Sequence, residues 1–345
     1  MAKLFFLLSG ENETLPAAEL KAILEAEELT YTITEKLDQL VRLEADPRSA
    51  KAVHRRSAYT MTSALELFTC QARDSSIIQA ANATNFKNAI NEGESFAVRI
   101  KRVKEYSAKN DTMSLERTLG KHILQNTTAT KVNLKTPHKT FFGVLTSNKL
   151  VFGIKLAEIT PKTYSERRPR KKPFFHPSAM PSKLARCMVN LSRAKAGELL
   201  LDPFCGTGST MIEAAFVGCR VLGLDVQRRM AEGTKLNLKH FGVEPEGLVI
   251  ADSRKLPLTR IDRVVTDPPY GKSATTMKST TKQIVEGVLS SAYSLLSVGQ
   301  LICIASPKTL SIARVGAELG YKHVESHFAY VHRTLTREIA VFEKT

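Results

Sequence analysis

The sequence lacks the features that mark a membrane protein, a disulfide-rich scaffold or a zinc-binding module. Its five cysteines are scattered over 345 residues without a CxxC pair or a histidine cluster at metal-ligand spacing, which argues against disulfides and zinc. The apolar run at residues 4–8 is too short for a membrane span and lacks the basic lead-in and cleavage site of a secretory leader. Repeats and low-complexity tracts are absent as well. We therefore expect a cytoplasmic globular protein without membrane association.

Positive charge is the main compositional feature. The chain has 43% hydrophobic and 24% charged residues and a formal net charge of +16, and its length favours two or three domains. Residues 1–55 carry 7 basic and 10 acidic residues, residues 56–160 carry 15 and 8, and residues 161–345 carry 28 and 16. Lysine and arginine that neutralise phosphates favour nucleic-acid binding, although excess lysine also serves solubility. The last two segments are thus the candidate nucleic-acid binders.

Charge and two prolines between Glu166 and Pro173 indicate a linker, which we place at residues 161–173. Before it the pattern is α+β. Residues 1–55 contain expected strands at 3–9, 29–34 and 39–43 and a helix after Thr14, which together suggest a ferredoxin-like domain. Residues 56–160 form a second unit, with expected strands at 95–103, 140–146 and 150–156 and a helix at 113–125.

Residues 174–345 alternate between apolar strands and helices. Strands are expected at 198–201, 220–224, 247–250, 263–266 and 300–305, and helices at 182–192, 209–216 and 228–240. This alternation predicts an α/β domain with a mostly parallel sheet covered on both faces. The final strands, 322–331 and 338–342, predict an antiparallel hairpin at the edge of that sheet.

Three acidic residues end three successive strands of this α/β part. The first strand ends at Asp202 and enters a helix through Gly206-Thr207-Gly208, whose glycines allow a tight turn close to a ligand. Asp202 could accept from an ammonium group, Asp225 from both hydroxyls of a ribose, and Asp252 from an adenine amino group. Together they predict a nucleoside site, although a turn without a ligand would have the same glycines. A dinucleotide site fits less well, because Met211 stands where its third glycine would be.

The motif Asp267-Pro268-Pro269-Tyr270-Gly271 follows an apolar strand. A base amino group is a poor nucleophile because its lone pair is delocalised into the ring. The Asp267 carboxylate and the Pro268 carbonyl could accept its two N–H bonds and aim the lone pair at a methyl donor, while Pro269 stiffens the turn and Tyr270 stacks on the base. A double proline alone would mark only a loop.

This motif resembles the (D/N/S)PPY signature of class I amino-methyltransferases, whose Rossmann-like fold residues 174–345 resemble throughout. The resemblance implies S-adenosylmethionine as the methyl donor. It implies that His176 and Pro177, in a segment similar to an FxxP element, close over the donor. It also implies a donor site that includes Phe204, Thr207, Val226 and Ser253 beside the glycines, Asp202, Asp225, Asp252 and Asp267.

The N-terminal half resembles a ferredoxin-like domain followed by a THUMP module at residues 56–160, through residues 86–104, Leu119-Gly120 and residues 132–137. THUMP modules bind tRNA, so the resemblance implies a folded tRNA as substrate. Basic residues of the module and the linker would contact phosphates: Arg99, Lys101, Arg102, Lys104, Arg167, Arg168, Arg170, Lys171 and Lys172. A solvated basic surface would have the same composition.

Both halves together resemble the archaeal and eukaryotic tRNA guanosine-10 N2-methyltransferase family, which implies transfer of one or two methyl groups to the exocyclic amine of a flipped guanine. Asp267 favours this family over the related guanosine-6 enzymes, whose motif usually begins with Asn. Adenine N6 methylation of DNA and a non-catalytic tRNA-binding protein remain alternatives. The family also implies a small zinc-binding activator protein as a partner of some members.

Overall fold

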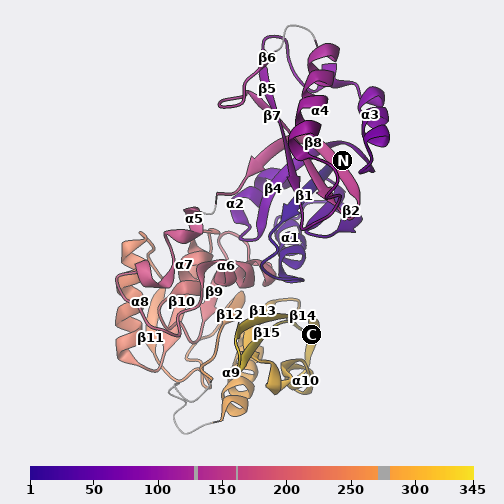
Figure 1. The fold of residues 1–345 in the computed structure, drawn as a ribbon. Coiled ribbons are helices and arrows are strands. Elements are labelled where there is room, and N and C mark those ends of the chain that lie inside the picture. Colours follow the sequence, from indigo (N-terminus) through magenta and orange to yellow (C-terminus); the bar gives the residue numbers. More distant parts are fainter. Residues whose placement is uncertain (128–130, 161, 271–279) are drawn as a thin grey trace. The chain divides into compact units, whose positions relative to one another are not determined.

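The computed structural model describes residues 1–127, 131–160, 162–270 and 280–345. It contains two compact units that do not follow contiguous stretches of the chain (Figure 1). The first comprises residues 1–11, 28–55 and 60–160. The second comprises residues 12–27, 56–59 and 161–345, so two short N-terminal segments belong to the same unit as the C-terminal half.

One eight-stranded sheet forms the first unit, in the order β2-β3-β1-β4-β8-β7-β5-β6. Its strands are β1 (Ala2–Leu8), β2 (Tyr31–Leu37), β3 (Leu40–Ala45), β4 (Thr60–Gln71), β5 (Ser95–Arg102), β6 (Lys131–Val132), β7 (Lys139–Thr146) and β8 (Lys149–Glu158). The antiparallel pair β1–β4 joins the strands of residues 1–55 to those of residues 56–160. The division between a ferredoxin-like and a THUMP domain therefore falls inside a continuous sheet, and it stays a prediction.

Helices α3 (Asp74–Ala83) and α4 (Thr112–Asn126) pack on strands β5, β7 and β8 of this sheet, and α2 (Ser49–Arg56) follows β3. The apolar positions Leu115, Leu119 and Ile123 of α4 are spaced at the helical period, so they share one face and are buried together. They enter a cluster of aromatic rings in which Phe141 meets Phe96 edge to face at 5.7 Å. Aromatic burial of this kind supplies much of the unit's stability.

The second unit contains a seven-stranded sheet in the order β11-β10-β9-β12-β13-β15-β14. Its strands are β9 (Leu199–Asp202), β10 (Arg220–Asp225), β11 (Gly247–Ile250), β12 (Arg263–Thr266), β13 (Leu301–Pro307), β14 (Tyr321–His332) and β15 (Leu335–Lys344). Strands β9 to β13 pair in parallel, whereas β15 is antiparallel to both β13 and β14. This confirms the predicted Rossmann-like sheet with a C-terminal antiparallel hairpin.

Helices cover both faces of this sheet (Figure 1). The helices of this unit are α1 (Leu15–Ala26), which packs on α6, together with α5 (Lys162–Ser165), α6 (Ser182–Leu191), α7 (Ser209–Ala215), α8 (Arg228–His240), α9 (Thr281–Leu295) and α10 (Ile312–Glu318). Leu222 on β10 joins the core cluster of α9 and α10, while a Cβ on the adjacent Gly223 would meet Met211 of α7. Because neighbouring strand residues point to opposite faces, α7 lies across the sheet from α9 and α10.

The order of the strands fixes where a ligand could bind. Strand β9 lies between β10 and β12, so consecutive crossovers run in opposite directions on its two sides. Such a switch point leaves a crevice outside the carboxyl ends of the strands. Asp202 and Asp225 end β9 and β10, and Asp267 directly follows β12, so all three stand at this edge.

Three general features hold for the described ranges only. None of their helices has the length and apolar character to cross a membrane. No group of three or more histidine, cysteine or acidic side chains there could hold a metal ion. All five cysteines are free thiols.

Candidate active site

The glycine-rich turn between β9 and α7 has the backbone conformation that its sequence requires. Gly206 and Gly208 adopt φ of +53° and +74°, in the left-handed region that favours glycine. The Gly208 amide donates to the Cys205 carbonyl at 2.7 Å, and α7 begins at the next residue. The turn therefore brings the first amides of a helix to the crevice with no side chain at either glycine.

Helix α8 holds this turn through two polar side chains. The Thr234 hydroxyl donates to the Gly206 carbonyl at 2.7 Å, and the Asn237 amide donates to the Thr207 carbonyl at 2.9 Å. A Cβ on Gly208 would come within 2.9 Å of the Thr234 methyl group. These contacts from α8 hold the turn that leads from β9 into α7. Sequence reasoning had assigned no role to Thr234 or Asn237.

Asp202 is buried at the base of the crevice. One carboxylate oxygen accepts from the Phe204 amide at 3.1 Å and from the Thr266 hydroxyl at 2.7 Å. Burial raises the pKa of Asp202 to about 7, which these hydrogen bonds only partly oppose. No lysine or arginine among the described residues forms an ion pair with it. A buried carboxylate without a cationic partner suits a positively charged ligand group.

Asp225 stands beside the same turn. Its carboxylate accepts from the Gly206 amide at 3.2 Å and from the Gln227 amide at 2.9 Å. Burial raises its pKa, and the hydrogen bonds from the Gln227 and Gly206 amides oppose this shift, with a smaller electrostatic contribution from the direction of His176. His176 and Asp225, predicted to share a ligand, therefore lie within electrostatic reach of each other. Val226 is exposed at the rim.

Asp252 differs from its predicted role in one respect. Its two oxygens accept from the Arg254 side chain, at 2.9 Å from Nε and 2.5 Å from Nη2, and this pairing lowers its pKa. The neighbouring Ser253 is buried. Arg254 therefore already occupies one side of the Asp252 carboxylate, a contact that the strand-end pattern did not reveal.

The double-proline turn places a carboxylate, a phenol and a guanidinium together. The Tyr270 hydroxyl donates to Asp267 Oδ1 at 2.7 Å, and Arg337 Nη2 lies 3.0 Å from Asp267 Oδ2. Arg337 Nε also donates to the Tyr270 oxygen, and its guanidinium lies 5.8 Å from the centre of the Tyr270 ring. Burial raises the pKa of Asp267, while Arg337 and Tyr270 oppose the shift. Pro268 is buried and Pro269 half-buried, and Gly271 lies outside the described residues.

Arg337 is the functional candidate that sequence reasoning missed. It stands on β15, opposite Pro307 at the carboxyl end of β13. Because β15 runs antiparallel to its neighbours, its first residues return to the edge where the parallel strands end. The predicted hairpin was the only signal in the sequence, and it could not indicate which residue faces Asp267.

The linker residues separate into two groups. Arg167 pairs with the buried Glu213, with Nε 2.7 Å from Oε1, and Lys172 is buried with Nζ 2.7 Å from the Ser209 hydroxyl. These two side chains hold the linker against α7, which differs from the phosphate-binding role predicted for them. Arg168, Arg170 and Lys171 are exposed.

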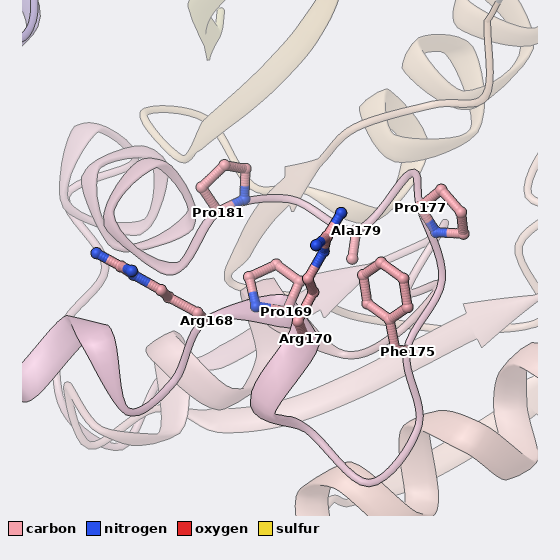
Figure 2. Close-up of a pocket in the computed structure, with 7 residues that line it drawn as sticks. All are labelled: Arg168, Pro169, Arg170, Phe175, Pro177, Ala179 and Pro181. Atoms are coloured by element: carbon pink, nitrogen blue, oxygen red, sulfur yellow. The ribbon is translucent and has the colours of Figure 1, made fainter.

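An open pocket of about 540 Å³ lies along this linker (Figure 2). It is lined by Arg168, Pro169, Arg170, Phe175, Pro177, Ala179 and Pro181. Figure 2 shows the Phe175 ring and the Arg170 side chain beside the same hollow. Phe175 is 41% exposed, and neither arginine has an ion-pair partner in the parts of the chain that the structure describes. The pocket thus offers positive charge together with an accessible aromatic ring.

In the first unit, the four predicted phosphate contacts on and after β5 are partly engaged by the protein. Arg102 donates to the Ser107 carbonyl at 2.6 Å and to the carbonyls of Tyr106 and Asn110. Lys104 pairs with Asp38 at 2.6 Å, and Arg99 donates to the Leu134 carbonyl at 2.8 Å. Lys101 is exposed, with its amine 3.6 Å from the Met61 sulfur. The Arg102 side chain therefore stabilises the loop that follows β5.

Known proteins resemble the chain over almost its entire length. It is 37% identical over 343 residues to the tRNA (guanine(10)-N2)-dimethyltransferase of Methanothermobacter thermautotrophicus, covering 99% of each chain. It is 30% identical over 363 residues to the protein of the same name from Methanocaldococcus jannaschii, covering 98% of this chain and 99% of that one. Residues 169–337 match a family described as an RMKL-like methyltransferase domain, and residues 64–236 match one described as DNA methylase.

Solved structures share the fold. TrmN from Thermus thermophilus aligns over 99% of this chain and 100% of its own, with a TM-score of 0.54 and 20% identity. SMU.472, a putative methyltransferase complexed with SAH, aligns over 100% and 99% with a TM-score of 0.56 and 15% identity. At such identities the likeness concerns the fold alone.

Proposed function

Because this chain belongs to the family of tRNA (guanine(10)-N2)-dimethyltransferases, we propose that it transfers methyl groups from S-adenosylmethionine to the exocyclic N2 of guanosine 10 in tRNA. The observation that carries the proposal is the position of the Asp267 carboxylate at the same strand edge as the glycine turn and Asp202. The relatives' names favour position 10 over position 6 and support the addition of two methyl groups.

The crevice fits the methyl donor in chemistry. Bound S-adenosylmethionine supplies an electrophilic methyl group. The Asp202 carboxylate, which has no cationic partner among the described residues, suits the ammonium of the donor's methionine part. Asp225 suits its ribose hydroxyls, and the glycine turn leaves room beside both. Phe204, Thr207, Val226, Asp252, Ser253, His176 and Pro177 complete the proposed donor site.

Asp267 and Tyr270 orient the target base. The Asp267 carboxylate and the Pro268 carbonyl accept the two N2–H bonds, which directs the nitrogen lone pair out of the ring plane, and the Tyr270 ring stacks on the base. These contacts would present N2 to the methyl group that bound S-adenosylmethionine would supply, and the N2 proton lost on transfer would pass to solvent. Arg337 and Tyr270 each hold one oxygen of Asp267 in place, so we assign this carboxylate to orientation rather than to proton removal.

The substitution Asp267→Ala tests this function. We expect turnover on tRNA to fall at least 100-fold, in keeping with the loss of an orienting contact, with little change in tRNA binding. Transfer of radiolabelled methyl groups and mass spectrometry of the nucleosides measure the rate, the modified position and the number of methyl groups. Duplex DNA serves as the competing substrate. Undiminished turnover of the variant, or methyl transfer to DNA alone, would remove the assignment.

We further propose that residues 56–160 act as a THUMP-type tRNA-binding domain after a ferredoxin-like domain at 1–55, with the exposed basic residues of the linker adding contacts. The net charge of +16 and the pocket at Arg168 and Arg170 support a polyanionic substrate. Among the basic residues predicted from sequence, Arg168, Arg170, Lys171 and Lys101 are exposed without an ion pair in the described parts, so we assign them the leading role.

The same proposal places the protein in the cytoplasm, where tRNA is modified, and includes a small zinc-binding activator as a partner. Methyl transfer by the purified chain alone, compared with transfer after co-expression with such a protein, decides whether the activator is required.

A further inference from the structure

Arg337 has hydrogen-bond donors that the protein leaves unused. Its Nε donates to Tyr270 and its Nη2 pairs with Asp267, which takes two of the five N–H groups of a guanidinium. Nη1 has no hydrogen-bond acceptor among the described residues. Because it is not among the buried polar atoms that lack a partner, it is accessible to solvent or to a ligand. The side chain is 11% exposed and its guanidinium lies against Asp267, so the remaining donors are accessible next to that carboxylate.

The surrounding structure fixes this guanidinium in place. Arg337 lies in the β13–β15 ladder, which continues from Leu301–Glu343 to Pro307–Arg337. The Tyr270 ring and the Asp267 carboxylate contact two sides of the fork. A planar guanidinium held at two points directs its other N–H bonds in a defined direction, unlike a flexible ammonium.

We propose that Asp267 and Arg337 together recognise the Watson–Crick edge of guanine, and that Arg337 is the residue that selects guanine over other purines with a 2-amino group. The inference rests on the proposed function and adds its base specificity. Asp267 accepts from N2–H and N1–H of the flipped base, and the free N–H groups of Arg337 donate to O6.

Asp267 and Arg337 match guanine because they offer two acceptor positions, from the carboxylate, followed by one donor, from the guanidinium. This order complements the Watson–Crick edge of guanine. Guanine presents two donors, N2–H and N1–H, followed by the O6 acceptor. A purine with an amino group at C6 presents an N1 lone pair toward the carboxylate and an N–H toward the guanidinium. Both contacts are repulsive, and a buried polar site discriminates strongly against such unpaired groups.

The Tyr270 hydroxyl has a separate function in this arrangement. It donates to Asp267 Oδ1, so it fixes the rotation of the carboxylate about its last bond. Tyr270 is therefore a positioning and stacking residue, whereas Arg337 is the residue whose loss should change the choice of base.

Three tRNAs that differ only at position 10 test the proposal: one with guanine, one with 2-aminopurine and one with 2,6-diaminopurine. All three carry the 2-amino target. The two analogues both lack N1–H, and they differ from each other only at C6, where one has hydrogen and the other an amine. The change in their kcat/KM ratio between the wild type and a variant therefore reports on the protein's contact at C6.

For the wild-type protein we expect guanine to be preferred, and 2-aminopurine to exceed 2,6-diaminopurine about 10- to 100-fold, as for one well-placed base contact. In Arg337→Ala that last ratio should fall to nearly 1. Arg314→Ala is the matched control, because Arg314 is an exposed arginine of the same unit that pairs only with Glu318. It should retain the wild-type ratio.

The proposal would be overturned if Arg337→Ala lowered kcat/KM for all three tRNAs by one common factor. That is the effect expected of an arginine with a merely structural role. If Arg337→Ala does not fold, Arg337→Lys decides, because it keeps a charge beside Asp267 without the fork; an unchanged analogue ratio there would also overturn it. Wild-type protein that methylates none of the three tRNAs would instead contradict the proposed function itself.

Discussion

Two buried carboxylates stand at the carboxyl edge of the sheet, and their partners differ. Asp267 has a guanidinium and a phenol, whereas Asp202 has only neutral donors. The negative charge of Asp267 also raises the pKa of Asp202. Asp202 is thus the residue in the crevice whose charge depends most on whether a cation is bound.

This difference predicts that donor affinity rises with pH. The folded pKa of Asp202 is raised from 3.8 to about 7, so the free protein holds a proton there that binding of an ammonium displaces. The same shift means that the free protein loses stability as pH rises from about 4 to about 7. We expect S-adenosylmethionine affinity to increase from about pH 6 to about pH 7.5, with release of up to one proton.

Calorimetry in two buffers of different ionisation enthalpy measures that proton release. Asp202→Asn serves as the control, because it is nearly isosteric and cannot ionise, and its weaker affinity should not vary with pH over this range. An affinity of the wild-type protein that is flat across the range would contradict the prediction.

Some residues of the candidate site could be predicted from the sequence, and others could not. Asp202, Asp225 and Asp267 could be found because they directly follow apolar strands, and parallel strands end at a common edge. Arg337 could not, because its position depends on the register of an antiparallel strand about seventy residues downstream of Asp267. Arg167 and Lys172 were predicted to contact RNA phosphates, but Glu213 and Ser209, far along the chain, engage their side chains.

Among the elements, periodicity identified those that are strongly amphipathic or uniformly apolar. The boundaries of α8 and of the five parallel strands were predicted to within one or two residues. The twelve-residue β4 was missed, because Thr60–Gln71 mixes threonine, serine and glutamine with its apolar residues and shows no clean alternation. Its burial comes from pairing with β1 on one side and β8 on the other, which is a tertiary effect.

The linker element leads to a prediction about RNA binding. Removal of both Arg168 and Arg170 by substitution with alanine should weaken tRNA binding and reduce the slope of log affinity against log salt concentration by about one per lost phosphate contact. Phe175→Ala should weaken binding by about 1–3 kcal/mol with an unchanged salt slope, if an unpaired base stacks on the ring. Filter-binding titrations at several salt concentrations measure both quantities.

Lys235→Ala is the control for this series. Lys235 is exposed on α8, in the same unit, and outside the pocket. It should leave both affinity and slope nearly unchanged. Arginine variants that behave like Lys235→Ala would show that the pocket does not contact the RNA.

At the scale of the whole molecule, the chain passes between its two compact units five times, at residues 11/12, 27/28, 55/56, 59/60 and 160/161. The second unit therefore includes α1 and residues 56–59 as part of its interior. Composition and motifs are read along contiguous stretches, so they could not indicate that a helix near the N-terminus packs with α6. The physical reason for this packing is a set of buried polar groups that come from all three segments.

Glu19 of α1 is the centre of that set. It is fully buried and accepts from the Ser57 hydroxyl at 2.7 Å, the Ala58 and Tyr59 amides at 2.9 Å, and the Asn190 side chain of α6 at 2.8 Å. Burial raises the pKa of Glu19, and each of these hydrogen bonds opposes the shift. Removal of the carboxylate would deprive four buried donors of the acceptor that they share, at a cost that rises with burial.

Glu19→Ala is therefore expected to destabilise the second unit by about 3 kcal/mol, which corresponds to a fall of roughly 6–12 °C in its melting temperature. Glu19→Gln should lie between the wild type and Glu19→Ala, because it keeps one acceptor oxygen but places an amide opposite donors. Glu13→Ala, an exposed acidic residue near the start of the same helix, should change the melting temperature by less than about 1 °C. Differential scanning calorimetry compares the three variants, and S-adenosylmethionine, which binds the second unit, should raise its transition selectively and so identify it. A transition that Glu19→Ala leaves unmoved would mean that α1 is dispensable for the unit, and that the contiguous C-terminal domain is stable without the N-terminal segments.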